Sequence, residues 1–172
     1  MTGVLKKPFH LWINEGKVDP DQPPVEIYDS EAHLVAVLKQ AVADGLRCFV
    51  TSNSKTKIAT IAAALDQEFG SKRRMIVVTA DTGGTEEVDD FIWDVAARAL
   101  EYDVILTSPS LGTGVDITFP EREKLIDVVF GFFEAQITTH FDYDQQLGRV
   151  RHPKAIKVWI MAGPPEVVRV KR

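Results

Sequence analysis

The residues best suited to chemistry lie near the carboxyl end of the chain, in the segment 144–153. If the chain is helical from about residue 142, positions i, i+3, i+4 and i+7 share one face. That face carries Gln145, Gly148, Arg149 and His152. A lone arginine there is most often a solvated cation. A glycine inside a helix costs about 1 kcal/mol relative to alanine, however, and is easier to explain where another group approaches closely.

A second candidate is the loop 107–116, which is rich in glycines and hydroxyl groups and ends in an acid. Gly112 and Gly114 would let a phosphate approach the backbone, and Asp116 could accept a hydrogen bond from a sugar hydroxyl. The alternative is an ordinary turn between two strands, with Asp116 as a cap. The residue types alone favour the turn.

A third candidate is the segment 51–55, which follows a predicted strand and opens a predicted helix. Backbone amides and the helix dipole favour a phosphate at such a place. An N-cap role for Asn53 or Ser54 explains the same residues equally well.

The elements that must position these segments are short apolar runs that alternate with amphipathic helices. The runs predict six strands, at 25–28, 47–51, 75–79, 103–107, 125–133 and 156–161. The expected helix caps are Ser30, either Asn53 or Ser54, and Thr85. Because the runs are apolar on both faces, we expect an α/β domain with a mainly parallel sheet between two layers of helices. Ligands bind beyond the carboxyl ends of such strands, and those ends are Thr51, Thr79, Thr107 and Phe133.

The composition is that of one globular domain. The chain has 172 residues, of which 45% are hydrophobic and 26% charged. It divides into an irregular lead-in at 1–24, a folded domain at 25–163 and a basic tail at 164–172. No apolar run is long enough to span a membrane and no signal-peptide core is present, so we expect a cytoplasmic protein without a membrane partner. The single cysteine, Cys48, lies in an apolar stretch and reads as a small buried hydrophobe.

The net charge of −5 argues against a nucleic-acid binder that relies on bulk charge. From residue 145 onward, however, the chain has seven Lys or Arg residues and a single acid, Glu166. Such asymmetry indicates either a basic edge that meets phosphate or a solvated tail. The basic residues are Arg149, Arg151, Lys154, Lys157, Arg169, Lys171 and Arg172.

Taken in order, the three segments carry a resemblance to a known family. Over residues 25–162 the chain resembles the second, C-terminal RecA-like lobe of a superfamily 2 helicase. Residues 48–54 resemble motif IV, 107–116 motif V, and 145–151 motif VI. The strand at 102–107 and the Arg-Val-Arg ending are most similar to origin-of-replication-binding helicases and to related plasmid or phage replication proteins.

The resemblance implies a role for each matching residue. Arg149 would be an arginine finger that stabilises charge on the departing γ-phosphate. Gln145 would orient Arg149 or the attacking water. Three residues would face the nucleotide, namely Gly112, Gly114 and Asp116. Five would contact the nucleic-acid backbone, namely Ser52, Ser54, Thr79, Thr107 and Ser108.

One residue departs from the family pattern. The usual second arginine of motif VI is His152 here, and Arg151 comes one position early. Pro153 disfavours helical geometry at His152, so the helix end could turn Arg151 toward the nucleotide. The sequence leaves open whether one arginine or two serve the site.

The parts that hold phosphates and Mg²⁺ are missing, because the sequence has no Gly-x-x-x-x-Gly-Lys-Ser/Thr loop. ATP with Mg²⁺ would therefore be held mainly by an N-terminal RecA-like lobe, in the same or another chain. We expect this chain alone to bind single-stranded or duplex DNA weakly and not to hydrolyse ATP. Two alternatives remain, a degenerate RecA-like interaction or nucleic-acid-binding module without ATP turnover, and an unrelated doubly wound domain that binds a small nucleotide.

Overall fold

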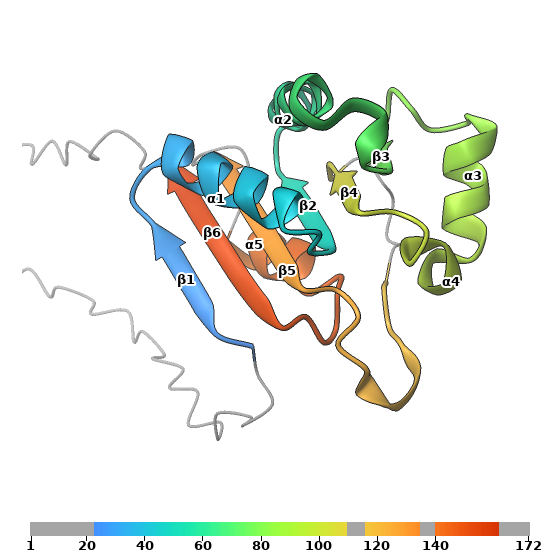
Figure 1. The fold of residues 1–172 in the computed structure, drawn as a ribbon. Helices are drawn as coiled ribbons and strands as arrows, with labels where there is room; N and C mark the ends of the chain where they lie inside the picture. Colours follow the sequence, from blue (N-terminus) through green and yellow to red (C-terminus); the bar gives the residue numbers. More distant parts are fainter. Residues whose placement is uncertain (1–22, 110–115, 135–139, 162–172) are drawn as a thin grey trace, which may run out of the picture.

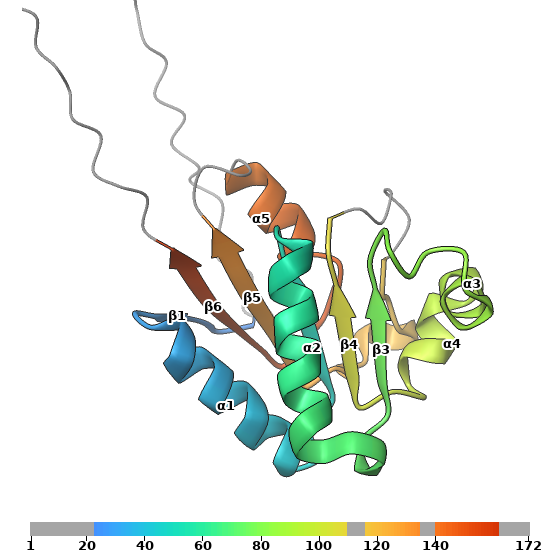
Figure 2. The same cartoon turned by 90° about the horizontal axis from the view of Figure 1, so that it is seen from above.

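The computed structural model describes residues 23–109, 116–134 and 140–161. Its centre is a six-stranded sheet in which every strand pair is parallel, in the order β1-β6-β5-β2-β4-β3 (Figures 1 and 2). The strands are β1 (Val25–Tyr28), β2 (Cys48–Ser52), β3 (Met75–Val78), β4 (Val104–Thr107), β5 (Val128–Glu134) and β6 (Ala155–Met161). The predicted α/β fold and its parallel sheet are therefore confirmed.

Helices cover both faces of the sheet, as the strands' two-sided hydrophobicity requires (Figure 2). One face carries α1 (Glu31–Ala43) and α2 (Lys55–Phe69). The other carries α3 (Glu86–Trp93), α4 (Val95–Ala99) and α5 (His140–Leu147). A separate apolar core fills the space on each face.

Two helix starts follow the sequence prediction. The Ser30 side chain accepts a hydrogen bond from the amide of His33 at 3.4 Å. The Ser54 side chain accepts one from the amide of Lys57 at 3.3 Å. Each bond satisfies one of the free amides of a helix's first turn.

The helix predicted from Thr85 is interrupted. Asp94 leaves helical geometry, with φ −139° and ψ 68°, and its side chain accepts from the amide of Ala97 to start α4. The spacing of Val88, Phe91, Ile92, Val95 and Ala99 predicts one continuous helix after Thr85. That prediction is wrong, because an aspartate that can bind its own backbone competes with helix continuation.

Cys48 is fully buried in the core beneath α1 and α2, as predicted. The lead-in at 1–24 lies outside the described residues except for its last two, and the basic tail at 164–172 lies outside them entirely. Among the helices that the structure describes, none is both long and apolar enough to cross a membrane.

Candidate functional site

A short backbone pairing joins the two segments that sequence reasoning singled out. Ile117 forms a parallel bridge with Val150. The Ile117 amide donates to the carbonyl of Arg149 at 2.7 Å, and the Arg151 amide donates to the carbonyl of Ile117 at 3.1 Å. Residues 33 positions apart in the chain are thus fixed in one register.

Alternation along this pairing decides which side chains reach the surface. Ile117 and Val150 are both buried in the core on the α3 side of the sheet. Successive residues of extended chain point to opposite faces, so the neighbours of this apolar pair point away from the core. The bridge therefore places Asp116, Arg149 and Arg151 on one surface, which we call the bridge cluster.

Within the bridge cluster, Arg151 holds Asp116 in a two-pronged ion pair. The Arg151 Nη2 lies 2.7 Å from Asp116 Oδ2, and its Nε lies 3.0 Å from Oδ1. The Thr118 hydroxyl donates to the same carboxylate at 3.1 Å. Hydrogen bonding from Arg151 is the main reason why the pKa of Asp116 is lowered, and Asp116 in turn raises the pKa of Arg151.

Arg149 sits differently from Arg151. Its side chain is half-buried, and this burial lowers the pKa of its guanidinium while the charge of Asp116 opposes the change. An arginine keeps its proton at neutral pH, so Arg149 brings a partly desolvated positive charge to the cluster. Two guanidinium groups and one carboxylate could together bind an anion that also carries hydroxyl groups.

The predicted helix face is wrong beyond Leu147, where α5 ends. Arg149 and His152 follow the helix instead of sharing a stripe with Gln145, which is exposed on α5. Gly148 closes the helix, since its amide donates to the carbonyl of Asp144 at 2.8 Å. A Cβ at Gly148 would lie 3.0 Å from that same oxygen, so the close approach at this glycine comes from its own backbone.

The glutamine that contacts the sheet is Gln146, which sequence reasoning missed. It is buried, and its Oε1 accepts from the Thr51 hydroxyl of β2 at 3.1 Å. The signal was helical spacing, because in a helix begun at about residue 142 the apolar residues Leu147 and Val150, one and four positions after Gln146, mark the inner face. Gln146 fixes α5, and with it the start of the bridge cluster, against the sheet.

The polar residues at the strand ends are mostly covered. Four of the five that the resemblance assigned to nucleic acid are buried, namely Ser52, Thr79, Thr107 and Ser108. Ser54 is half-buried and caps α2. The Ser52 hydroxyl accepts from the Ser54 amide at 3.1 Å, whereas the buried Ser108 hydroxyl has no partner among the described residues.

Asn53 has a structural task that the cap hypothesis did not anticipate. Its Nδ2 donates to the carbonyl of Glu134 at 2.7 Å, and the amide of Glu134 donates to its Oδ1 at 2.9 Å. This reciprocal pair ties the carboxyl ends of β2 and β5 together. Gly112 and Gly114 lie outside the described residues, so the nucleotide-facing loop is represented by Asp116.

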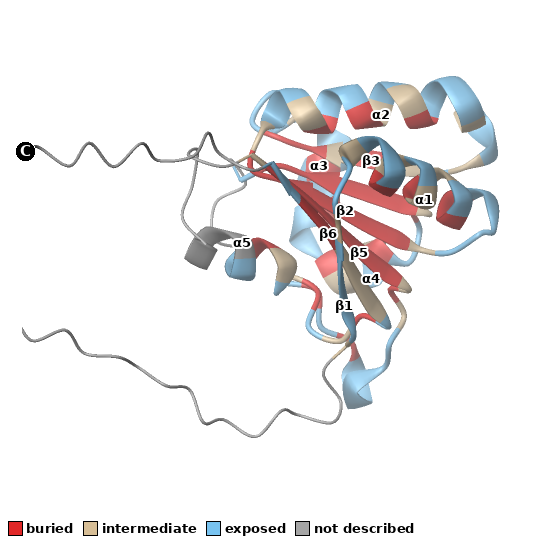
Figure 3. Cartoon of the chain, turned by 90° about the vertical axis from the view of Figure 1, so that its left-hand side faces the viewer, coloured by how far each residue is buried: buried red, intermediate tan, exposed pale blue. Residues whose placement is uncertain are grey.

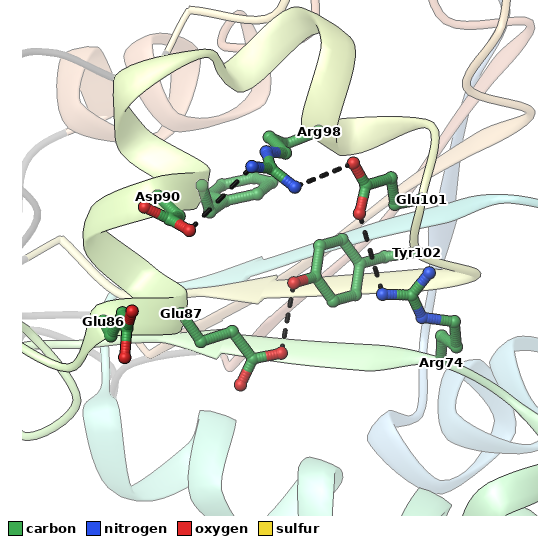
Figure 4. A pocket seen from close by; sticks show the side chains of 8 residues that line it. Arg74, Glu86, Glu87, Asp90, Arg98, Glu101 and Tyr102 are labelled. Atoms are coloured by element: carbon green, nitrogen blue, oxygen red, sulfur yellow. Dashed lines mark hydrogen bonds and ion pairs between the residues drawn. The ribbon is translucent and has the colours of Figure 1, made fainter.

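A separate cavity of 330 Å³ lies beside α3 and α4 (Figure 4). Arg98 bridges Asp90 and Glu101 there, at 3.8 and 3.0 Å, and the Tyr102 hydroxyl donates to Glu87 at 3.1 Å. Arg74 lies 3.7 Å from Glu101. Both arginines are ion-paired and three of the four carboxylates that line the cavity are engaged, which is typical of a structural network. The described part of the chain also contains no cluster of three or more His, Cys, Asp or Glu that could hold a metal ion.

No protein-family profile and no curated protein sequence matches this chain. Its fold is similar to solved helicase structures. The C-terminal domain of the DEAD-box protein Dbp5 aligns with a TM-score of 0.52 and 17% identity, over 83% of this chain and 77% of that domain. Mycobacterium smegmatis helicase Lhr, solved with ssDNA and AMP-PNP, aligns with a TM-score of 0.54 and 13% identity, over 80% of this chain.

The match to Lhr covers 19% of the Lhr chain. A longer structure of S. cerevisiae Dbp5, bound to Gle1 and IP6, aligns with a TM-score of 0.55 and 16% identity, and the match covers 37% of that Dbp5 chain. Similarity at this level of identity establishes the fold alone, an α/β domain with a parallel sheet that matches RecA-like lobes. None of these named structures is a replication-origin helicase.

Proposed function

We propose that this chain serves as the second lobe of an ATP-dependent DNA helicase or translocase, of the kind used in DNA replication. The observation that carries the proposal is the Ile117–Val150 bridge. It unites the motif V-like and motif VI-like segments in one cluster, on a fold shared with C-terminal helicase domains. A binding module has no evident need to juxtapose these two segments.

In this proposal the two arginines have different tasks. Arg149 serves as the arginine finger, because a half-buried guanidinium exerts a stronger field on a phosphoryl group than a fully hydrated one. Arg151 stays with Asp116 and orients it. A carboxylate has about four acceptor positions, so Asp116 can still accept from a ribose hydroxyl while Arg151 is bound.

Most of the remaining parts come from outside the described residues. An N-terminal RecA-like lobe, in the same or another chain, would hold ATP with Mg²⁺, and Gly112 and Gly114 would approach the nucleotide. Gln145, exposed on α5, would orient Arg149 or the attacking water once the two lobes close.

The nucleic-acid track would run across the carboxyl ends of β2, β3 and β4. The candidates there are Ser52, Ser54, Thr79, Thr107 and Ser108. The unpartnered hydroxyl of Ser108 supports this placement, because a buried polar group without a partner costs free energy that a ligand contact would offset. The ssDNA bound to Lhr is consistent with DNA as the strand.

One observation favours the alternative, a RecA-like interaction module without ATP turnover. The carboxylate that would face ribose is already engaged by Arg151 and Thr118. If Asp116 keeps both contacts and gains none to the nucleotide when nucleotide is added, the cluster is a structural brace.

The test measures ATP hydrolysis in a protein that joins this lobe to its phosphate-binding lobe, in cis or in trans. Arg149→Ala should lower kcat by about 10³-fold or more, since an arginine finger contributes about that much. Arg98→Ala, in the paired network beside α3, is the matched control and should leave kcat unchanged. Turnover that survives Arg149→Ala would reject the finger and favour the interaction module.

A further inference from the structure

The edge of the sheet at β1 has an apolar face that no described segment covers. β1 pairs only with β6 among the described strands, so its outer backbone edge is open. Val25 is 59% exposed and Ile27 is 75% exposed. Figure 3 shows β1 as an exposed strand at the rim of a sheet whose central strands are buried.

The strand register shows which face these side chains occupy. Val25 is opposite Ile156 and Ile27 is opposite Val158, and residues paired in this way share a face. The alternate residue, Glu26, is on the α1 side, where it accepts from Lys157 at 2.6 Å. Val25 and Ile27 are therefore on the face that carries α5.

A cavity of 540 Å³ lies on this face between β1 and the end of α5. Apolar side chains form much of its wall, including Val25, Leu147, Val150, Pro153 and Ile156. Two charged residues, Asp144 and Arg151, also line it. We call this cavity, together with the exposed side chains of Val25 and Ile27, the β1 groove.

We propose that residues 9–13 of this same chain, Phe-His-Leu-Trp-Ile, dock in the β1 groove. Four of these five residues are apolar, and they form the apolar cluster nearest in sequence before β1. Pro23 itself lines the cavity, so the preceding chain starts at the groove's own wall. The ten residues from Ile13 to Pro23 can span about 33 Å when extended, which is enough to return along a four-residue strand.

Tethering favours this occupant over a second copy of the chain. A segment joined to its site through a short stretch of the same chain has an effective concentration in the millimolar range. A second copy at micromolar concentration would compete at a disadvantage of about 10³-fold. The open edge of β1 also offers backbone groups to which an extended segment can add hydrogen bonds.

Hydrogen exchange of the whole chain, measured by mass spectrometry, tests the proposal. Amides of residues 9–13 should exchange at least tenfold more slowly than in an unstructured peptide of the same sequence. Ile27→Lys, in the β1 groove, should abolish that protection. Leu11→Asp, in the docking segment, should abolish it as well. Trp93→Lys is the matched control, because Trp93 is 91% exposed on α3, beyond the opposite edge of the sheet, and its replacement should leave the protection intact.

Three results would overturn the proposal. Residues 9–13 could exchange as fast as the free peptide, or their protection could survive Ile27→Lys. Protection that rises with protein concentration in step with dimer formation would make a second copy the occupant. Because Ile27 is largely exposed, its replacement should not unfold the domain, and circular dichroism of each variant checks this.

Discussion

Gly131, in the middle of β5, allows α5 to pack against the sheet, and replacing it with alanine should separate the two. A Cβ at this position would lie 2.7 Å from Cε2 of Phe133 and 2.9 Å from Cδ2 of Leu147, the last residue of α5. Both distances are well below the roughly 3.5–4.0 Å of a favourable carbon contact. Phe133 is fully buried, so its ring has little room to move away.

The expected magnitude follows from two opposing effects. Overpacking a core by one methyl group costs about 1–3 kcal/mol. Replacing glycine by alanine returns about 0.4–1 kcal/mol, because the unfolded chain loses conformational freedom. We expect a net loss of about 1–2 kcal/mol in the free energy of unfolding for Gly131→Ala, or a fall in Tm of about 2–8 °C for a chain of this length.

Gly83→Ala is the matched control because it makes the same chemical change without the clash. A Cβ at Gly83 would have its nearest contact at 3.6 Å, and the backbone there does not have a positive φ. This variant should gain about 0.4–1 kcal/mol. Urea unfolding and calorimetry of both variants give the comparison. A Gly131→Ala protein as stable as the wild type would refute the close packing of α5 on β5.

Three further results are expected. Thr51→Val should cost about 1–3 kcal/mol by leaving the buried Gln146 oxygen unpaired, and the double variant with Gln146→Leu should recover part of this loss in urea unfolding. Burial raises the pKa of Cys48 to about 12. The stability that the neutral thiol contributes should therefore be fully present below the unfolded thiol's pKa of about 8.5 and should be lost as the pH rises from there toward 12. A Cys48→Ala protein whose free energy of unfolding shows the same alkaline decline would contradict this. Because Arg151 lowers the pKa of Asp116, the pair's small contribution should be present above the ordinary Asp pKa of about 4 and disappear as the pH falls below it, a dependence that Asp116→Asn should remove from acid unfolding curves.

The sequence predicted the sheet well because its strands are encoded locally. The central strands are apolar runs with polar residues on either side, and the caps Ser30 and Ser54 precede helices with a clear inner stripe. The extent of α5 could not be found in this way. The helix stops at Leu147 where Val150 pairs with Ile117, and that partner belongs to a segment 33 residues earlier in the chain. A tertiary contact decided the helix end.

The candidate site was predicted in its residue types and not in its arrangement. Asp116, Arg149 and Arg151 were selected individually, whereas their joint exposure depends on the bridge between their apolar neighbours. The alternation of polar and apolar residues in both segments was visible in the sequence. The pairing partner and its register were not, because many extended segments carry the same alternation.

The bridge also makes the geometry of the cluster a consequence of core packing. Because side chains alternate along an extended chain, a slip of one residue would turn Asp116 inward and bring Ile117 to the surface. Burial of Ile117 and Val150 opposes that slip, since each large apolar side chain that leaves water stabilises the fold by about 1.5–3 kcal/mol. The positions of Arg149 and Arg151 are thus maintained by two aliphatic residues that are buried in the core. Replacing either aliphatic residue should disturb both arginines together, whereas replacing one arginine removes one charge and leaves the register intact.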